Sequence, residues 1–355
     1  KKNNHRGHVV SITFNEPASH LVQLSRVSKK DIHWSLKREI SDLVSKSLLE
    51  SAEARQVRNG ERCRGCALWI IYDIFRNPAD LILLHKLRCA QFCHVRLCPL
   101  CLWRKSLVWR SRFFQAWPLI EKSFPKVRYF HLVLTYPNCE VEELRETLDL
   151  MSLAWKRMIS RRDWPAIGFF RSVEVTRNKK DGTSHPHFHV LMMVGSDYFS
   201  GRTYMNINDW KVYWASAIEW KGDYERLRHP YLRAVKGIKS EGVSVSQAVV
   251  EVAKYAVKFD YKFCTFLRKK EGQAWLRELD KQLLGTRAIA TGGVIKKFIN
   301  DADVSSEEML LQDEIEIRKD IDEMWKYEWF GAKKDYFRTK ILSELERNFW
   351  LRDGT

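Results

Sequence analysis

Three histidines alternate with other residues in one short segment of the chain. The segment is His185-Pro-His187-Phe-His189, and it continues into the apolar run Val190–Val194. This alternation is typical of a β-strand, in which residues i and i+2 point to the same side. His187 and His189 can therefore bind one metal ion while Phe188 faces the core.

A divalent ion that must leave room for substrate oxygens needs a third protein ligand. Alternating segments flank the turn sequence Asn178-Lys-Lys-Asp-Gly182, which predicts a β-hairpin. If the hairpin is centred in this turn, Glu174 lies opposite His187 on the same face. Two imidazoles and one carboxylate suit Mn²⁺ or Mg²⁺, and the imidazoles favour Mn²⁺. His185 is then a spare ligand or a hydrogen-bond donor to a phosphate. The alternative is that all these histidines are structural.

A later segment carries a candidate nucleophile. Residues 245–258 predict an amphipathic helix. At about 100° per residue, Glu251, Tyr255 and Lys258 share its polar side, and valines and alanine already fill the opposite, apolar side. A tyrosine between a carboxylate and an ammonium group is suited to nucleophilic attack, although an ordinary surface tyrosine is the alternative.

Six of the eight cysteines lie between residues 63 and 101. Clustered Cys-x-x-Cys pairs in a large chain favour thiolate ligands over disulfides, and Zn²⁺ takes four such ligands in a closed, structural site. A redox pair and unliganded buried thiols are the alternatives. The expected ligands are Cys66, Cys93, Cys98 and Cys101, whereas Cys63, Cys89 and His94 could replace one of them or form a second site.

The charge of the chain favours a polyanionic partner. It contains 61 Lys and Arg against 44 Asp and Glu, a formal net charge of +17, which indicates nucleic acid rather than a membrane surface. Residues 301–355 are acidic, with 15 acidic and 9 basic side chains. The residues expected to contact phosphates and bases are Arg96, Arg104, Lys105, Arg110, Trp103 and Trp109, and the alternative is that they form a solvated basic helix face.

No segment approaches the roughly 18 uninterrupted apolar residues of a membrane span, and the start of the sequence, Lys1-Lys-Asn-Asn, is not an apolar signal. We therefore expect a soluble, cytoplasmic protein without a membrane partner.

The order of the predicted elements indicates an α+β protein in which helices flank a central antiparallel sheet. Predicted helices cover residues 34–54, 103–123, 141–158, 207–220 and 245–258, and predicted strands cover 127–135, 167–177, 185–194 and 286–296. Two acidic helices are expected within Ser305–Phe349, as a helical C-terminal region. The expected regions are an N-terminal arm (1–60), a zinc-binding subdomain (61–105), a main α+β domain (106–300) and the acidic C-terminal region (301–355).

Residues Cys66–Phe298 resemble the rolling-circle replication initiators of small plasmids, in the HUH endonuclease superfamily. The similar segments are Phe130-His-Leu-Val-Leu-Thr135, His185-Pro-His-Phe-His-Val190 and Glu251-Val-Ala-Lys-Tyr255-Ala-Val-Lys258. The cysteine segment from Cys93 to Lys105 also resembles one found in a single branch of these initiators.

The resemblance implies a metal-dependent nickase and strand transferase that acts on single-stranded or hairpin origin DNA. The Tyr255 hydroxyl would attack phosphorus beside an ion held by His187, His189 and Glu174, which leaves a 5′-phosphotyrosine link and a free 3′-OH. Tyrosine has an ordinary pKa of about 10, so the ion and Lys258 would stabilise its phenolate. Glu251 resembles the acid that activates water for the terminating cleavage. A host helicase and a DNA polymerase are the implied partners, and the chain could also form a homodimer.

Three other functions fit parts of the pattern. A transposase or relaxase of the same superfamily would share the site and differ in the DNA that it recognises. A non-catalytic zinc DNA-binding protein would form no covalent link to DNA. A metal-dependent RNA-processing enzyme would cut RNA without a tyrosine adduct.

Overall fold

The computed structural model describes residues 22–76, 83–223, 227, 229–235, 245–253, 257, 259–301 and 321–352. These residues divide into two compact units, each built from segments that are distant in the sequence. The first unit contains residues 22–36, 67–91 and 321–352 as far as they are described, and the second contains the described residues of 37–66 and 92–301. Among the described helices, none has the length and apolar character needed to cross a membrane.

The first unit is built on a four-stranded antiparallel sheet with the order β2-β1-β8-β9. Its core is largely aromatic: the edge of the Tyr72 ring packs on Tyr327 and His85, and the His85 Nε2 atom lies 3.1 Å from the Tyr327 hydroxyl. The strands are β1 (Trp69–Arg76), β2 (Leu83–Ala90), β8 (Glu323–Phe330) and β9 (Asp335–Ile341), and the helices are α1 (Leu24–Val27), η1 (Lys29–Asp31), α11 (Glu344–Arg352) and the start of α2 (His33–Leu49).

The prediction of two helices within residues 305–349 is wrong for β8 and β9, and residues 302–320 lie outside the described residues. The segment Glu323–Phe330 is rich in aromatic residues, which favour strands. Its backbone completes hydrogen bonds with β1, a pairing between residues about 250 positions apart. Among the described residues after Asp301, α11 alone conforms to the expected helical C-terminal region.

The second unit contains a five-stranded antiparallel sheet with the order β6-β3-β5-β4-β7, and with its flanking helices it confirms the predicted α+β class. The strands are β3 (Arg128–Thr135), β4 (Ala166–Arg177), β5 (Ser184–Val194), β6 (Tyr231–Val235) and β7 (Ile289–Gly292). The helices are the remainder of α2, α3 (Ala54–Arg64), α4 (Pro99–Ser123), η2 (Val141–Glu143), α5 (Leu144–Ile159), α6 (Ile207–Ala217), α7 (Val245–Val252), α8 (Tyr261–Leu267), α9 (Lys270–Gln282) and α10 (Gly293–Asp301).

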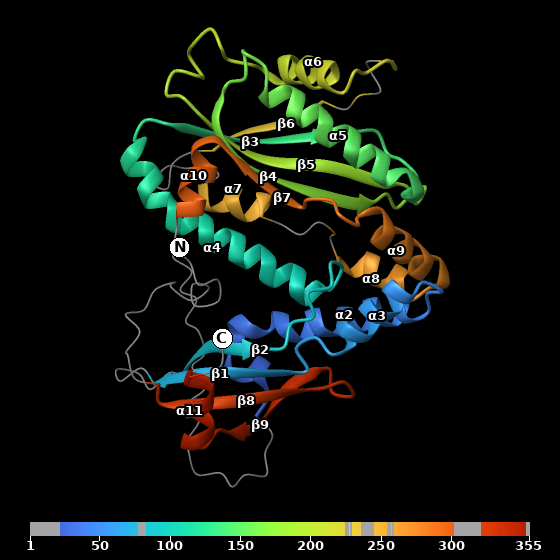
Figure 1. Ribbon diagram of the computed structural model, residues 1–355, viewed down its shortest axis with the longest axis vertical. Helices are drawn as coiled ribbons and strands as arrows, with labels where there is room; N and C mark the ends of the chain where they lie inside the picture. The colour runs from blue at the N-terminus through green and yellow to red at the C-terminus, as the bar shows by residue number, and fades with distance from the viewer. Residues whose placement is uncertain are drawn as a thin grey trace, which may run out of the picture. The chain divides into compact units, whose positions relative to one another are not determined.

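Helices cover both faces of the five-stranded sheet, with α5 and α6 on one side and α4, α7 and α10 on the other (Figure 1). On the α4 side, Phe170 of β4 stacks with Phe113, and Ile295 of α10 belongs to the same buried cluster. On the opposite side, Phe188 of β5 packs against Trp155 and Trp214. The alternation of side chains along β4 and β5 thus assigns odd and even positions to different helical layers.

The hairpin of β4 and β5 has the register predicted from its turn. Glu174 pairs with His187, and Ser172 pairs with His189. The strand from residue 128 to 135 and the helix that follows it are also confirmed. Because the side-chain period of a strand is two, a shift of one residue would have moved every histidine to the other face.

The predicted helices 34–54 and 207–220 end earlier than expected, at Leu49 and Ala217, and the helix predicted for 245–258 and the strand predicted for 286–296 are also shorter. Helix α7 ends at Val252, and Val257 forms a parallel bridge with Val175 instead of continuing the helix. The pairing of β7 with β4 reaches only as far as Val173, so that Val257 can pair with β4 beyond it, at Val175. The predicted strand 286–296 is a strand only at Ile289–Gly292, because Gly293 adopts a positive φ and starts α10.

Candidate metal centres

Two histidine nitrogens converge on one carboxylate oxygen in the second unit. The Nε2 atom of His187 lies 3.1 Å and that of His189 2.8 Å from the Oε2 atom of Glu174. The three ligand atoms are within 4.8 Å of one another. Such an arrangement of two nitrogens and one oxygen suits a divalent cation, and three protein ligands leave coordination positions for a substrate.

These three side chains lie on the same face of the sheet as Phe170, which packs against α4 and α10. Glu174 is four residues from Phe170 on β4, and His187 and His189 alternate with Phe188 on β5. Each of the three side chains is about one tenth exposed, at 10% to 12%. The ligand side chains are thus largely buried, with a small exposed fraction.

A second partner fixes the orientation of each histidine. The Nδ1 atom of His187 lies 3.2 Å from the carbonyl oxygen of His185, and Nδ1 of His189 lies 3.1 Å from Nε2 of His131. With the proton of each neutral ring on Nδ1, both Nε2 lone pairs would be available to a cation, whereas without a cation an Nε2–H group can donate to Glu174.

His131 was not among the predicted site residues, although it lies in the quoted β3 segment. It is buried, on the same face of the sheet as His189, and its ring is nearly parallel to the His189 ring. The sequence position of His131 could have indicated this, because residues 129, 131 and 133 of a strand share one face. His185, the proposed spare ligand, packs its ring against His187 and lies outside the group of three ligand atoms.

The electrostatics of the group favour an ionised carboxylate. Burial raises the pKa of Glu174, but hydrogen bonds to His187 and His189 lower it more, so that the pKa lies well below its ordinary value. Glu174 is therefore negatively charged at neutral pH, as a ligand for a cation must be.

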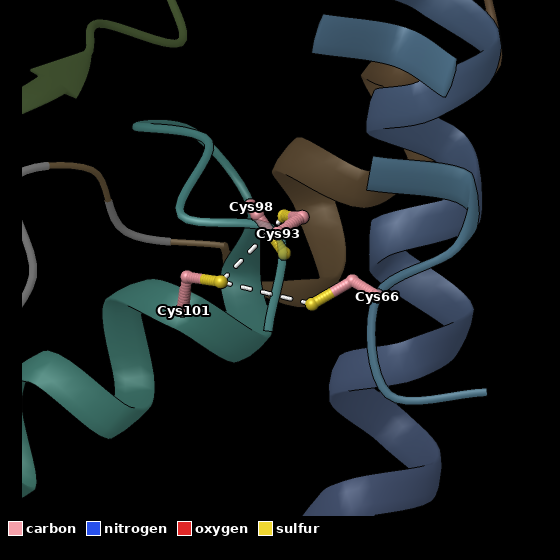
Figure 2. A group of neighbouring side chains, drawn as sticks. All are labelled: Cys66, Cys93, Cys98 and Cys101. Atoms are coloured by element: carbon pink, nitrogen blue, oxygen red, sulfur yellow. Dashed lines mark hydrogen bonds between the residues drawn. The ribbon is translucent and has the colours of Figure 1, made fainter. Parts of the chain in front are cut away.

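A second ligand cluster consists of four cysteine sulfurs in the same unit. The Sγ atoms of Cys66, Cys93, Cys98 and Cys101 lie within 4.8 Å of one another. Figure 2 shows Cys101, on the first turn of α4, directed toward both Cys93 and Cys66, with Sγ–Sγ distances of 3.6 Å to each. Four sulfurs without an open position match the donor set of a structural zinc site.

Backbone amides support two of these sulfurs. The amide of His94 donates to the Cys101 Sγ atom at 3.3 Å, and that of Val95 donates to the Cys93 Sγ atom at 3.4 Å. His94 has a φ of 55°, which turns the chain sharply between the two cysteines. His94 thus contributes its backbone to the cluster.

The other cysteine candidates lie outside the group of four. The Cys63 thiol donates to the carbonyl of Ser41 at 3.5 Å and also interacts with the Cys93 and Cys98 thiols from outside the group of four. Cys89 belongs to β2 of the first unit. The buried guanidinium of Arg38 donates to the carbonyls of Cys63 at 3.1 Å and Cys66 at 2.6 Å. Arg38 therefore fixes the turn that carries Cys66, a role that the sequence pattern did not indicate.

The crowded sulfurs titrate far from ordinary thiols. Hydrogen bonding to Cys101 lowers the pKa of Cys93 to about 4 and also lowers that of Cys98, whereas the same partner raises the pKa of Cys66. Some sulfurs in the cluster thus lose their protons easily, and four thiolates together require a cation among them.

Of the three predicted catalytic residues, the structure describes Glu251. Tyr255 and Lys258 lie outside the described residues. Glu251 is half-buried on the last turn of α7, and Val249 and Ala253 are fully buried, as expected for the apolar side of that helix. Val257 bridges Val175, the residue that follows Glu174.

Comparisons with known proteins identify the family. The family model described as "Replication protein" matches residues 84–337. This chain belongs to the replication protein family. "Protein rep" of Streptococcus pneumoniae serotype 2 is 32% identical over 257 residues, which cover 70% of this chain and 76% of that protein. "Protein rep" of Lactiplantibacillus plantarum is 32% identical over 306 residues, 80% of this chain and 90% of that protein. A "Replication protein" of Staphylococcus aureus is 32% identical over 230 residues, 61% of this chain and 93% of that protein.

No solved structure is significantly similar to the chain. The family match confirms the resemblance to plasmid replication initiators of the HUH superfamily, and it covers both the Glu/His group and three of the four clustered cysteines. The role in replication initiation implies binding to origin DNA.

Proposed function

We propose that this replication protein starts rolling-circle replication by nicking one strand of plasmid origin DNA. The observation that carries the proposal is the convergence of the His187 and His189 Nε2 atoms on Glu174 Oε2, with all three side chains on one face of the sheet. Glu174, His187 and His189 would hold Mn²⁺ or Mg²⁺. The bound ion would supply Lewis-acid stabilisation of the negative charge that develops on the scissile phosphate.

In the proposed reaction the Tyr255 hydroxyl loses its proton and attacks phosphorus. A bond forms between the tyrosine oxygen and phosphorus, and the bond from phosphorus to the 3′ oxygen breaks. The 3′ oxygen takes up a proton and becomes the primer end for a polymerase, while the 5′ phosphate stays on the tyrosine. Lys258 would stabilise the phenolate and Glu251 would activate water for the terminating cleavage.

The path of the chain around Glu174 supports Tyr255 as the nucleophile. Val257 is held beside Val175 on β4, next to the proposed ligand Glu174. Tyr255 is two positions before Val257 in the sequence, and two residues of chain span at most about 7 Å. Among the described residues 245–253, those that are buried are all apolar, and Glu251 is half-buried.

The four cysteines would hold Zn²⁺ with a structural role. The cluster is closed by Cys66, Cys93, Cys98 and Cys101 and is braced by backbone amides and Arg38. It joins the end of α3 to the start of α4. Zinc binding would therefore stabilise the N-terminal end of α4, the long helix that packs on one face of the five-stranded sheet.

The test is a covalent-adduct assay. Wild type and Tyr255→Phe are incubated with Mn²⁺ and a single-stranded origin oligonucleotide labelled at its 3′ end, and the products are separated under denaturing conditions. We expect a labelled protein band with wild type and none with Tyr255→Phe. Tyr261→Phe is the matched control, because Tyr261 is 86% exposed on nearby α8, and it should form the adduct normally.

Glu174→Gln should also abolish the adduct and leave DNA binding intact. An adduct in Tyr255→Phe would assign the nucleophile to another residue. Sequence-specific DNA binding without any adduct, in all variants and with Mn²⁺ present, would instead support the non-catalytic DNA-binding alternative.

A further inference from the structure

A cavity of about 550 Å³ lies next to the cysteine cluster, between the start of α4 and the segment that leads into β7. This volume is within the range of sites that bind small organic molecules, roughly 300 to 1,000 Å³. Its wall includes Cys101, one of the clustered cysteines. The residues that line the cavity include Arg96, Arg104, Lys105, Trp109, Arg287 and Ile289.

The cavity is strongly basic. Four of its lining residues are Lys or Arg, and none of the described residues that line it is acidic. Arg96 is engaged structurally, because its guanidinium donates to the carbonyl of Thr286 at 2.7 Å and to its hydroxyl at 2.6 Å. Lys105 and Arg287 are exposed. The entrance therefore presents cations that suit a phosphate group.

The interior of the cavity is apolar and aromatic. Trp109 lines it and is half-buried, with its ring 6.0 Å from the Phe170 ring of the core. The guanidinium of Arg104 lies over the ring of Phe92, another lining residue, at 5.5 Å. An aromatic surface rimmed by cations matches a nucleotide, because a base stacks on aromatic rings while its phosphate binds Lys and Arg.

The position of the cavity relates it to the Glu/His group. Ile289 of its wall pairs with Ser172 of β4, and Ser172 pairs with His189 of β5. Neighbouring strands are about 4.8 Å apart, so His189 lies about 10 Å from this wall across the sheet. Phe170, which Trp109 contacts, is on the same face of β4 as Glu174. One strand of DNA can therefore reach both places.

We propose that this cavity binds one nucleotide of single-stranded DNA, with the base against Trp109 and the phosphate on Lys105 and Arg287. This inference rests on the proposed nicking function for the choice of ligand. A base can enter only when it is unstacked, so the cavity would recognise the single-stranded part of the origin and hold the strand close to the metal ligands.

The test measures binding of fluorescein-labelled oligo(dT) by anisotropy, with zinc-loaded protein in a Tyr255→Phe background. Lys105→Gln/Arg287→Gln should reduce the slope of log affinity against log salt by about 1.4, or about 0.7 for each lost phosphate contact. Trp109→Leu should weaken binding about tenfold through lost stacking. Lys122→Gln is the control, because Lys122 is exposed on the same helix, about 25 Å from Lys105 along its axis, and it should change neither quantity.

Zinc content and the unfolding midpoint check that each variant is folded. Unchanged affinity and salt slope in the folded Lys105→Gln/Arg287→Gln variant would overturn the proposal. An equal effect of Trp109→Leu on double-stranded DNA would also overturn it, because paired bases cannot enter the cavity. The adduct assay separates this result from the nicking proposal: loss of binding without any adduct in the wild type would reject nicking alone, and normal adduct with unchanged binding would reject the cavity alone.

Discussion

The ring nitrogens His131 Nε2 and His189 Nδ1 lie 3.1 Å apart, and the two rings are inclined by only 13°. His131 belongs to β3 and His189 to β5, and these strands are direct neighbours. Because the contact engages the nitrogen of His189 that faces away from Glu174, it leaves the other nitrogen directed toward the carboxylate. His131 is thus a positioning residue for the proposed metal ligand.

We expect His131→Ala to weaken Mn²⁺ binding at the Glu/His group by about 10- to 100-fold, because His189 loses the partner that fixes its ring and its proton. Titration calorimetry with Mn²⁺ would measure this change. His33→Ala is the control, since His33 is exposed in the first unit, and it should bind Mn²⁺ like wild type. Unaltered affinity in folded His131→Ala would show that the contact does not orient the ligand.

Glu174 could be predicted from the sequence, whereas His131 could not. The partner of His187 followed from one hairpin, whose turn sets the register of residues close in the chain. The neighbour of His189 lies 58 positions away on a strand whose place in the sheet no local pattern specifies. Arg38 was missed for the same reason, because it reaches the cysteine turn from α2.

The C-terminal strands show the same limit more clearly. The apolar stripes in the acidic region after position 300 suggested helices, yet Glu323–Phe330 pairs with β1, a strand about 250 positions earlier in the sequence. Tertiary pairing overrides weak local preferences in such segments. The register of the hairpin, which one short turn joins, was predictable, whereas the pairing of strands with distant partners was not.

The cysteine cluster leads to a second prediction, on zinc content. Cys66→Ser should lose bound zinc, because it removes one of four converging sulfurs. Cys63→Ser should retain it, because Cys63 lies outside the group of four converging sulfurs. Elemental analysis of purified protein gives the zinc-to-protein ratio. Equal zinc loss in the two variants would mean that Cys63 takes part in binding.

Asp335 is expected to stabilise the first unit through its hydrogen bonds. It is buried at the start of β9 and accepts hydrogen bonds from the side chains of Gln23, Ser25 and Ser35. In Asp335→Asn the side-chain NH₂ group would face the donors of Gln23, Ser25 and Ser35. We therefore expect a loss of about 1 to 3 kcal/mol in the free energy of unfolding at neutral pH. Urea unfolding followed by tryptophan fluorescence measures this loss, and Asp149→Asn, at an exposed position of α5, should have little effect.

The same carboxylate gives the prediction a pH dependence. Burial raises the pKa of Asp335, but the hydrogen bonds lower it more, so that the folded-state pKa lies below the ordinary value. Stability from a group with a depressed pKa is fully present above its unfolded-state pKa, about 3.9 for Asp, and is lost as the pH falls through the folded-state pKa. The difference between wild type and Asp335→Asn should therefore shrink below about pH 4. A constant difference across this range would contradict the role of the charge.

The last prediction separates the two cleavages of the proposed cycle. Glu251 lies on the final turn of α7, half-buried, four positions before Tyr255 in the sequence. If it activates water in the terminating cleavage, Glu251→Ala should form the first tyrosine adduct at nearly the normal rate and should release it far more slowly. The measurement follows adduct formation on one oligonucleotide and then its resolution after a second origin oligonucleotide is added.

Gln247→Ala is the matched control for Glu251→Ala, because Gln247 is exposed one helical turn earlier on α7. It should leave both steps unchanged. Equal slowing of both steps in Glu251→Ala would assign Glu251 to the shared chemistry or to the support of α7, and the water for termination would then need another base. A selective loss of resolution would show that one tyrosine can serve two cuts because a carboxylate takes over the second.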